Sequence, residues 1–171
     1  EALLLPMDVS RKKSLVDIAL NLATSSGASY CDVRIGRYLQ QSIITRESKV
    51  QSIVSSESIG AGIRVLVKGA WGFAATSDLT ATGIGNAVQQ AMLIANSNAK
   101  IQTQPVQLAK APALGVVSWA TPIKINAMAI PVKEKADLLL SVNAAAMNAG
   151  ANFVNSQLFL VNEQKYFAST D

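Results

Sequence analysis

The residues of this sequence that could carry chemistry are few and widely spaced. The chain contains one cysteine, Cys31, and no histidine, and its eleven carboxylates are spread almost evenly along it. A catalytic triad that uses histidine as the general base is therefore excluded within this sequence, and a thiolate at Cys31 would have no histidine to activate it. Clusters of histidine, cysteine or carboxylate that could hold a metal ion are also lacking. We assign no catalytic residue and no metal ligand to this chain.

Cys31 has a structural interpretation. It alternates with Val33 and Ile35, which is the pattern of a strand with one buried side. The sequence therefore predicts that Cys31 is a small buried hydrophobic residue. A single cysteine also excludes a disulfide within the chain, so a reducing, cytoplasmic location is the default expectation.

Two other motifs are equally weak as chemical sites. Glu134 and Asp137 lie three residues apart beside lysines, which is typical of a solvated helix face. Gly60-x-Gly62 is followed by a strand pattern and not by a helix start, so it is not a dinucleotide or phosphate loop.

Composition limits the class of protein. Half of the 171 residues are apolar and 15% are charged, which is typical of a globular chain, and we expect one domain over residues 1–171. No run approaches the roughly 18 apolar residues of a membrane span. The net charge is +4, and the basic residues are scattered except for Arg11-Lys12-Lys13 near a helix start. We interpret that run as a solvated helix face, with a phosphate-binding patch as the alternative, and we expect no direct binding of nucleic acid.

The order of the predicted elements indicates the fold class. Three helices are expected over residues 10–26, 80–99 and from Pro131 to Gly150, where glycine suits the residue after a helix. Strands are expected over 30–35, 39–46, 49–55, 59–67, a returning strand from Ala70, 153–161 and 165–170. This order predicts an α+β fold, a largely antiparallel sheet with about three helices packed on one face. Residues 101–130 are expected to form an ordered surface crossing, anchored by Val116, Val117, Trp119 and Ile123.

The clearest single element is a hairpin. With Lys68-Gly69 as the two central residues of a tight turn, Leu66 faces Trp71 and Arg64 faces Phe73. One face then carries Gly60, Gly62, Arg64, Leu66, Trp71 and Phe73, and the other carries Ile59, Ala61, Ile63, Val65, Val67, Ala70, Gly72 and Ala74. The second face is a natural core surface.

Two interpretations of the first face stay open. In one, the aromatic rings cover the glycines and the guanidinium of Arg64 lies over a ring. In the other, Arg64, Trp71, Phe73, Gly60 and Gly62 form a contact surface for another domain, a subunit or an extended peptide. The two interpretations are compatible.

Several motifs in a fixed order resemble a known family. They are Tyr30-Cys-Asp-Val-Arg34, Gly60-x-Gly62-x-Arg64, Gly69-x-Trp-Gly-Phe73, Trp119-x-x-Pro122, Pro131-x-x-x-Lys135-x-x-Leu-Leu-Leu140 and Phe167-x-Ser-Thr-Asp171. From Tyr30 to the end, about 140 residues, the chain resembles the N-terminal domain of the TldD/PmbA family, and its TldD-like branch in particular.

The resemblance implies a cytoplasmic zinc metallopeptidase that acts on unfolded or extended peptides, historically called a modulator of DNA gyrase. In this family TldD-like and PmbA-like subunits pair, and the metal motif, His-Glu-x-x-x-His with a later cysteine, lies in the C-terminal domain. This sequence has no such motif, and Cys31 does not correspond to the metal cysteine. The resemblance also implies that family members continue with Asp-Gly and further strands at the point where this sequence ends.

We therefore interpret the chain as the noncatalytic N-terminal domain of a longer TldD-like parent. It is expected to help form the proteolytic chamber and subunit contacts, with zinc held only by the parent. Its expected partners are the C-terminal catalytic domain, a TldD/PmbA-type subunit in a dimer, and the peptide substrate, with no membrane. The alternative is a stand-alone interaction or regulatory module of the gyrase-modulator type, without protease activity.

Overall fold

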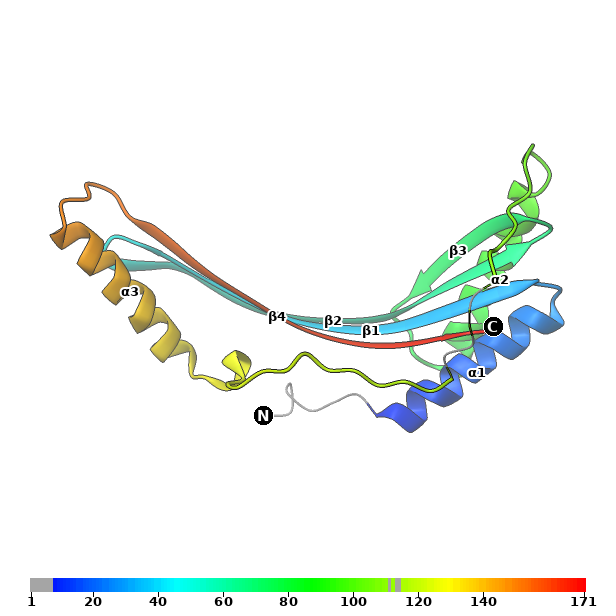
Figure 1. Ribbon diagram of the computed structural model, residues 1–171, viewed down its shortest axis with the longest axis horizontal. Helices are drawn as coiled ribbons and strands as arrows, with labels where there is room; N and C mark the ends of the chain where they lie inside the picture. The colour runs from blue at the N-terminus through cyan, green and yellow to red at the C-terminus, as the bar shows by residue number, and fades with distance from the viewer. Residues whose placement is uncertain (1–7, 111, 113–114) are drawn as a thin grey trace. The chain divides into compact units, whose positions relative to one another are not determined.

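The computed structural model describes residues 8–110, 112 and 115–171. Its elements, in chain order, are α1 (Val9–Ser25), β1 (Tyr30–Arg46), β2 (Lys49–Val67), β3 (Ala70–Thr76), α2 (Ala81–Asn98), the 3₁₀ turn η2 (Ala127–Ala129), α3 (Val132–Asn148) and β4 (Asn155–Ser169). The strands form one antiparallel sheet in the order β3-β2-β1-β4 (Figure 1). The predicted α+β class, with a largely antiparallel sheet and three helices, is confirmed.

The chain divides into two compact units that share the three long strands. Among the described residues, the helix-pair unit comprises 8–37, 59–110, 112, 115–119 and 164–171 and contains α1 and α2. The single-helix unit comprises 38–58 and 120–163 and contains α3. The assignment of residues 1–171 to one domain stays a prediction.

The helix ends follow local chemistry. Asp8 caps α1 by accepting a 2.9 Å hydrogen bond from the Ser10 amide, and Thr80 caps α2 by accepting one of 3.0 Å from the Gly83 amide. Gly27 and Gly150 follow α1 and α3 with φ of +92° and +100°, values that favour glycine. All three predicted helices are present, with ends within a few residues of those expected.

The hairpin has the predicted register. Leu66 pairs with Trp71 and Arg64 with Phe73. Lys68 and Gly69 have φ of +49° and +76°, and positive φ at both central residues is the requirement of a type I′ turn.

The strands are longer and fewer than predicted. The expected breaks near residues 36–38, 56–58 and 162–164 do not exist, because β1, β2 and β4 each run through them. Apolar alternation fails there, but backbone ladder hydrogen bonds do not require apolar side chains. The gap between the expected strands over 39–46 and 49–55 is confirmed, since Glu47 and Ser48 join β1 to β2.

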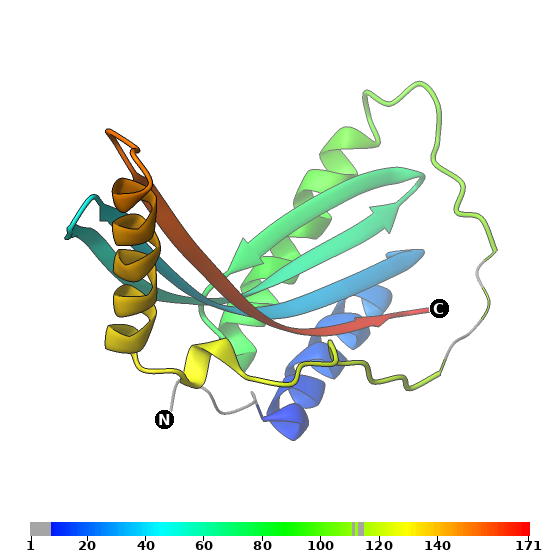
Figure 2. The ribbon, with the colours of Figure 1, turned by 60° about the vertical axis from the view of Figure 1, so that its left-hand side comes forward.

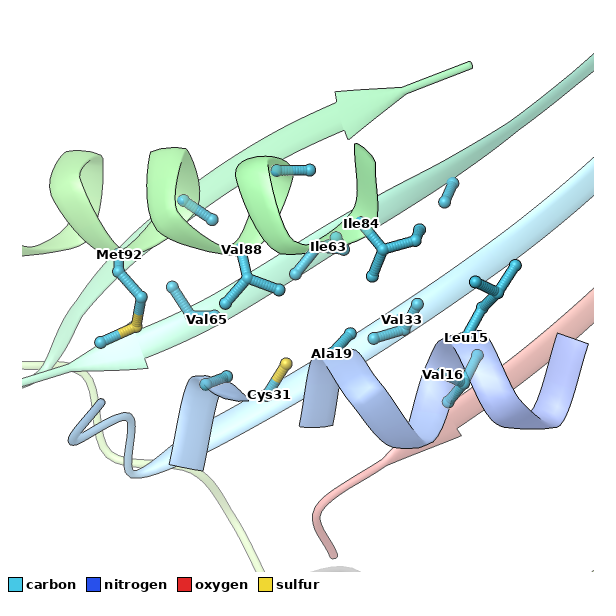
Figure 3. Packing of buried hydrophobic residues seen from close by; sticks show 14 of the residues in the cluster. Leu15, Val16, Ala19, Cys31, Val33, Ile63, Val65, Ile84, Val88 and Met92 are labelled. Carbon is cyan, nitrogen blue, oxygen red and sulfur yellow. The ribbon is translucent and has the colours of Figure 1, made fainter. Parts of the chain in front are cut away.

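The helix-pair unit has an extensive apolar core. In the described structure seventeen buried residues from α1, α2 and strands β1 and β2 form one cluster. Figure 3 shows side chains of α1, such as Val16, and of α2, such as Val88, directed toward Val33 and Val65 on the strands. Ile59, predicted to belong to this core, is 41% exposed, because it precedes the first residue of β2 paired with β3, Ala61.

The single-helix unit has a much smaller apolar core. Its buried cluster comprises Ile43, Ala136 and Leu139, with Val132 and Leu158 packed against it. Polar side chains of α3 also form hydrogen bonds with the strands of this unit, beside which α3 lies in Figure 2. Apolar residues of α3 are not all buried, since Met147 is 37% exposed.

The segment between α2 and α3 is not anchored as predicted. Val116, Val117, Trp119 and Ile123 are 104%, 73%, 82% and 64% exposed. Their hydrophobicity suggested burial, but the described residues of the chain do not cover them. Within those residues, no helix is both long enough and apolar enough to cross a membrane.

Candidate functional site

In the helix-pair unit α1 and α2 lie on one face of the sheet (Figures 1 and 2). The residues of interest lie on the other face, away from the apolar core. Strand alternation sends Cys31, Val33 and Ile35 into the core and their neighbours to the other side. We call the resulting surface the open sheet face, and its members are Tyr30, Asp32, Arg34, Gly62, Arg64, Trp71, Phe73 and Phe167.

Asp32 is the centre of this face. It is 1% exposed, although its charge requires compensation at such a site. Arg64 on β2 supplies it, donating hydrogen bonds of 2.8 Å from Nε and 2.6 Å from Nη2 to Oδ2 of Asp32. Nη1 of Arg34 lies 3.4 Å from Oδ1, an ion pair without hydrogen-bond geometry. One buried carboxylate is therefore shared between two guanidinium groups.

Each of these guanidinium groups also lies over an aromatic ring. Arg64 is 4.5 Å from the centre of the Trp71 ring, and Arg34 is 5.2 Å from that of Phe167 on β4. Tyr30 meets Trp71 edge to face, with centroids 5.8 Å apart. Such contacts hold both arginines in defined positions while leaving their side chains 39% and 45% exposed for Arg64 and Arg34.

The electrostatics of the cluster agree with this geometry. The hydrogen bond to Asp32 raises the pKa of the Arg64 guanidinium, so this group stays charged. Burial, assisted by the neighbouring Asp32 carboxylate, raises the pKa of the Tyr30 phenol, so this group stays neutral. The open sheet face therefore combines two positioned cations, one buried anion and exposed rings, a composition that suits binding.

The five predicted contact residues are all placed in the helix-pair unit. Arg64, Trp71 and Phe73 lie together on the open sheet face, and Phe73 is 56% exposed. A Cβ on Gly62 would lie 3.2 Å from the Phe73 ring, so this glycine is explained by contact within the chain. A Cβ on Gly60 would lie 3.0 Å from the Thr76 carbonyl oxygen, so Gly60 is explained in the same way. The contact role of the five residues stays a prediction.

Four members of the site, Tyr30, Asp32, Arg34 and Phe167, were not predicted. The alternation of residues 30–35 did place Asp32 and Arg34 on the side away from Cys31, but nothing local showed that this expected strand lies beside the expected strand over 59–67. Phe167 reaches Arg34 from a strand more than 130 residues along the chain. The one signal in the sequence was that the carboxylate of Asp32 could pair with an arginine on a neighbouring strand.

Other residues whose side chains could take part in chemistry have structural roles. Cys31 is fully buried, and burial raises the pKa of its thiol to about 12, so the prediction of an inert core residue is confirmed. Of the basic run, Lys13 pairs with Asp17 at 2.7 Å and Lys12 lies over the Tyr166 ring. Asp137 pairs with Lys133 on an exposed helix face, as predicted.

The residues present do not fit a zinc ion. The chain has no histidine. Over residues 8–110, 112 and 115–171, no three side chains of His, Cys, Asp or Glu gather as metal ligands would. The side chains described here therefore offer zinc no set of ligands.

Comparison with known proteins supports the resemblance to the TldD/PmbA family. Residues 31–95 match the family model described as PmbA/TldA metallopeptidase domain 1, which confirms the resemblance to the first domain of the TldD/PmbA family. The matched segment contains Asp32, Arg34, Arg64, Trp71 and Phe73. A search of curated proteins gives no match.

Solved structures share the fold. A proposed modulator of DNA gyrase from Bacteroides thetaiotaomicron has a TM-score of 0.75 at 15% identity, covering 96% of this chain and 38% of its own. One from Thermotoga maritima has a TM-score of 0.71 at 16% identity, covering 93% and 35%. TldE from Thermococcus kodakarensis has a TM-score of 0.58 at 14% identity, covering 94% and 35%. This chain therefore spans less than two fifths of the length of these solved relatives.

Proposed function

We propose that this chain, as the first domain of a TldD/PmbA-type protein, is a noncatalytic part of a zinc metallopeptidase that helps to enclose the proteolytic chamber. One observation carries the proposal. The segment that matches the first domain of a family described as metallopeptidases is the segment that builds most of the open sheet face. The absence of histidine from the sequence means that any catalytic zinc must be held by other residues of the parent.

Subunit contact is the role that we propose for the open sheet face. Arginine and aromatic residues are enriched at the centres of protein interfaces, and charged residues are tolerated there when they are paired. Arg64, Trp71 and Phe73 have this composition, and the buried Asp32 keeps Arg64 in place. The proposed partner is a TldD/PmbA-type subunit, within a cytoplasmic dimer whose substrate is an unfolded or extended peptide.

The test uses the parent protein. Its gene, read beyond Asp171, should encode His-Glu-x-x-x-His and a later cysteine. The purified full-length protein, with its partner subunit, should hydrolyse unstructured peptides, lose activity with a chelator and regain it with zinc. The 171-residue chain alone should show no such activity. Robust zinc-dependent hydrolysis by the chain alone would contradict the noncatalytic assignment.

The second candidate is an interaction module without a protease. It is favoured by the descriptions of two solved relatives as proposed modulators of DNA gyrase. A stop codon directly after Asp171, together with an assembled complex that never hydrolyses peptide, would select this candidate instead.

A further inference from the structure

The open sheet face has more guanidinium donors than the chain uses. Each arginine side chain offers five N–H donors in a planar fork that matches a carboxylate. Arg64 directs its Nε and Nη2 groups to Asp32, and Arg34 makes no hydrogen bond within the part of the chain that the structure describes. The single charge of Asp32 balances only one of the two arginines, so the cluster keeps a net positive charge.

The charge of the chain is concentrated in the same unit. The helix-pair unit contains ten basic and five acidic residues, which is a net charge of +5. The described part of the single-helix unit contains five basic and five acidic residues, which is a net charge of zero. The field near the open sheet face therefore favours an anionic partner.

The surroundings of the arginines favour a protein segment over a small anion. Phe73 and Phe167 are 56% and 50% exposed beside the guanidinium groups, so the face presents apolar area together with its charge. A partner that buries both must carry carboxylates and apolar side chains close together. A free inorganic anion would leave the rings in water.

We infer that the open sheet face binds an acidic segment of a partner protein, with a carboxylate of that segment received by Arg34 and the spare donors of Arg64. This inference rests on the proposed contact role and adds the chemistry of the partner. Asp32 then has a positioning role, because it holds Arg64 by hydrogen bonds and leaves the hydrogen-bond donors of Arg34 available to the partner.

Fluorescence anisotropy of the 171-residue chain with a labelled peptide of alternating glutamate and valine tests the inference. Binding is expected at low ionic strength, with at least about tenfold weaker binding of the glutamine–valine peptide. At about 1 M salt, where the screening length is only about 3 Å, binding should be lost. Failure of the acidic peptide to bind, or equal binding of the glutamine–valine peptide, would overturn the inference.

Variants separate a specific site from general charge attraction. Arg34→Gln removes a guanidinium that receives the carboxylate of the partner, so binding should weaken about tenfold. The fold should be retained, because Arg34 makes no hydrogen bond within the described chain. Lys68→Gln removes the same charge from the exposed hairpin turn of the same unit and should change binding less than about twofold. Equal losses in both variants would contradict the assigned site.

Two further results have defined meanings. An oligonucleotide that binds more tightly than the acidic peptide, with the same dependence on Arg34, would assign the site to phosphate and overturn the inference. Peptidase activity of the full-length protein reports on the proposed function independently. An active, assembled parent whose open sheet face ignores acidic peptide would therefore refute this inference alone.

Discussion

The two units of this protein are stabilised in different ways. The helix-pair unit packs seventeen buried residues of its described structure into one apolar cluster. In its described part, the single-helix unit has a buried apolar cluster of only three residues and holds α3 with polar contacts, among them Lys135 Nζ to Gln41 Oε1 at 2.6 Å. Apolar packing is cumulative and tolerant, whereas a buried polar contact depends on each partner being present.

Asn143 shows this dependence most clearly. Although fully buried, it donates to Thr45 Oγ1 at 3.1 Å and to the Glu47 carbonyl at 2.9 Å, and it accepts a 2.6 Å hydrogen bond from Ser156. Apolar residues elsewhere on α3, Leu138 and Val142, are 60% and 51% exposed. The comparison teaches that one unit stabilises itself through its core, while the other relies on a few directional contacts.

The largest expected effect is at Gly72 in the helix-pair unit. A Cβ there would overlap the Ala91 carbonyl oxygen of α2 and lie 2.6 Å from the Ala95 amide nitrogen, a conflict with backbone that no rotamer can relieve. Gly72→Ala should therefore cost about 4 kcal/mol or more, or prevent folding, as measured by urea denaturation. As a control, Gly85→Ala in α2, where the nearest atom is 3.9 Å away, should stabilise by about 0.5–1 kcal/mol. Equal stability of the two variants would refute the close packing of α2 on β3.

Core truncations compare the two units directly. Ile63→Ala, in the large cluster, should cost near the upper end of the usual range of about 2–5 kcal/mol. Leu139→Ala, in the small cluster and already 9% exposed, should cost near the lower end because fewer neighbours lose contacts. Chemical denaturation followed by circular dichroism measures both. A larger loss at Leu139 would reverse the comparison.

Removing the polar contact should act only on its own unit. Asn143→Ala leaves the partner groups of Thr45, Glu47 and Ser156 without their hydrogen bonds, at a cost of about 1–3 kcal/mol. Hydrogen exchange should then accelerate in α3 and remain unchanged in α1 and α2. Asn148→Ala, exposed on the same helix, is the matched control and should leave exchange within α3 nearly unchanged. Uniform acceleration in all three helices would show that the units do not differ in this way.

Cys31 reports on the helix-pair unit without altering it. Because its thiol is fully buried and its pKa is raised to about 12, little thiolate forms at about pH 8. The native chain should resist alkylation at that pH, whereas the urea-unfolded chain should react fully. Alkylation of native protein at the rate of the unfolded chain would indicate that this core opens readily.

The smallest effect is expected on the outer side of α3. The double substitution Leu138→Gln and Val142→Gln replaces exposed side chains, so stability should change by less than about 0.5 kcal/mol for each. Thermal denaturation monitors the change. A loss of several kcal/mol would show that this side of α3 is packed within the chain after all.

The sequence predicted what depends on local patterns. The three helices and the register of Arg64 with Phe73 follow from short-range patterns, and all are present. Contacts between residues far apart in the sequence could not be predicted, and the packing of the Arg34 guanidinium on the Phe167 ring is an example. Burial was also predicted wrongly for Trp119, which is exposed. A hydrophobic side chain does not by itself determine whether other residues of the chain cover it.

The measurement that tests the central proposal most directly is subunit assembly of the full-length protein carrying Phe73→Ala. Phe73 lies on the open sheet face and is 56% exposed, and Phe159 of the single-helix unit, 57% exposed, provides a matched control. Light scattering of each variant with its partner subunit should show weakened assembly for Phe73→Ala and normal assembly for Phe159→Ala, both at unchanged thermal stability. Normal assembly and peptide hydrolysis in the Phe73→Ala variant would contradict the contact role of this face.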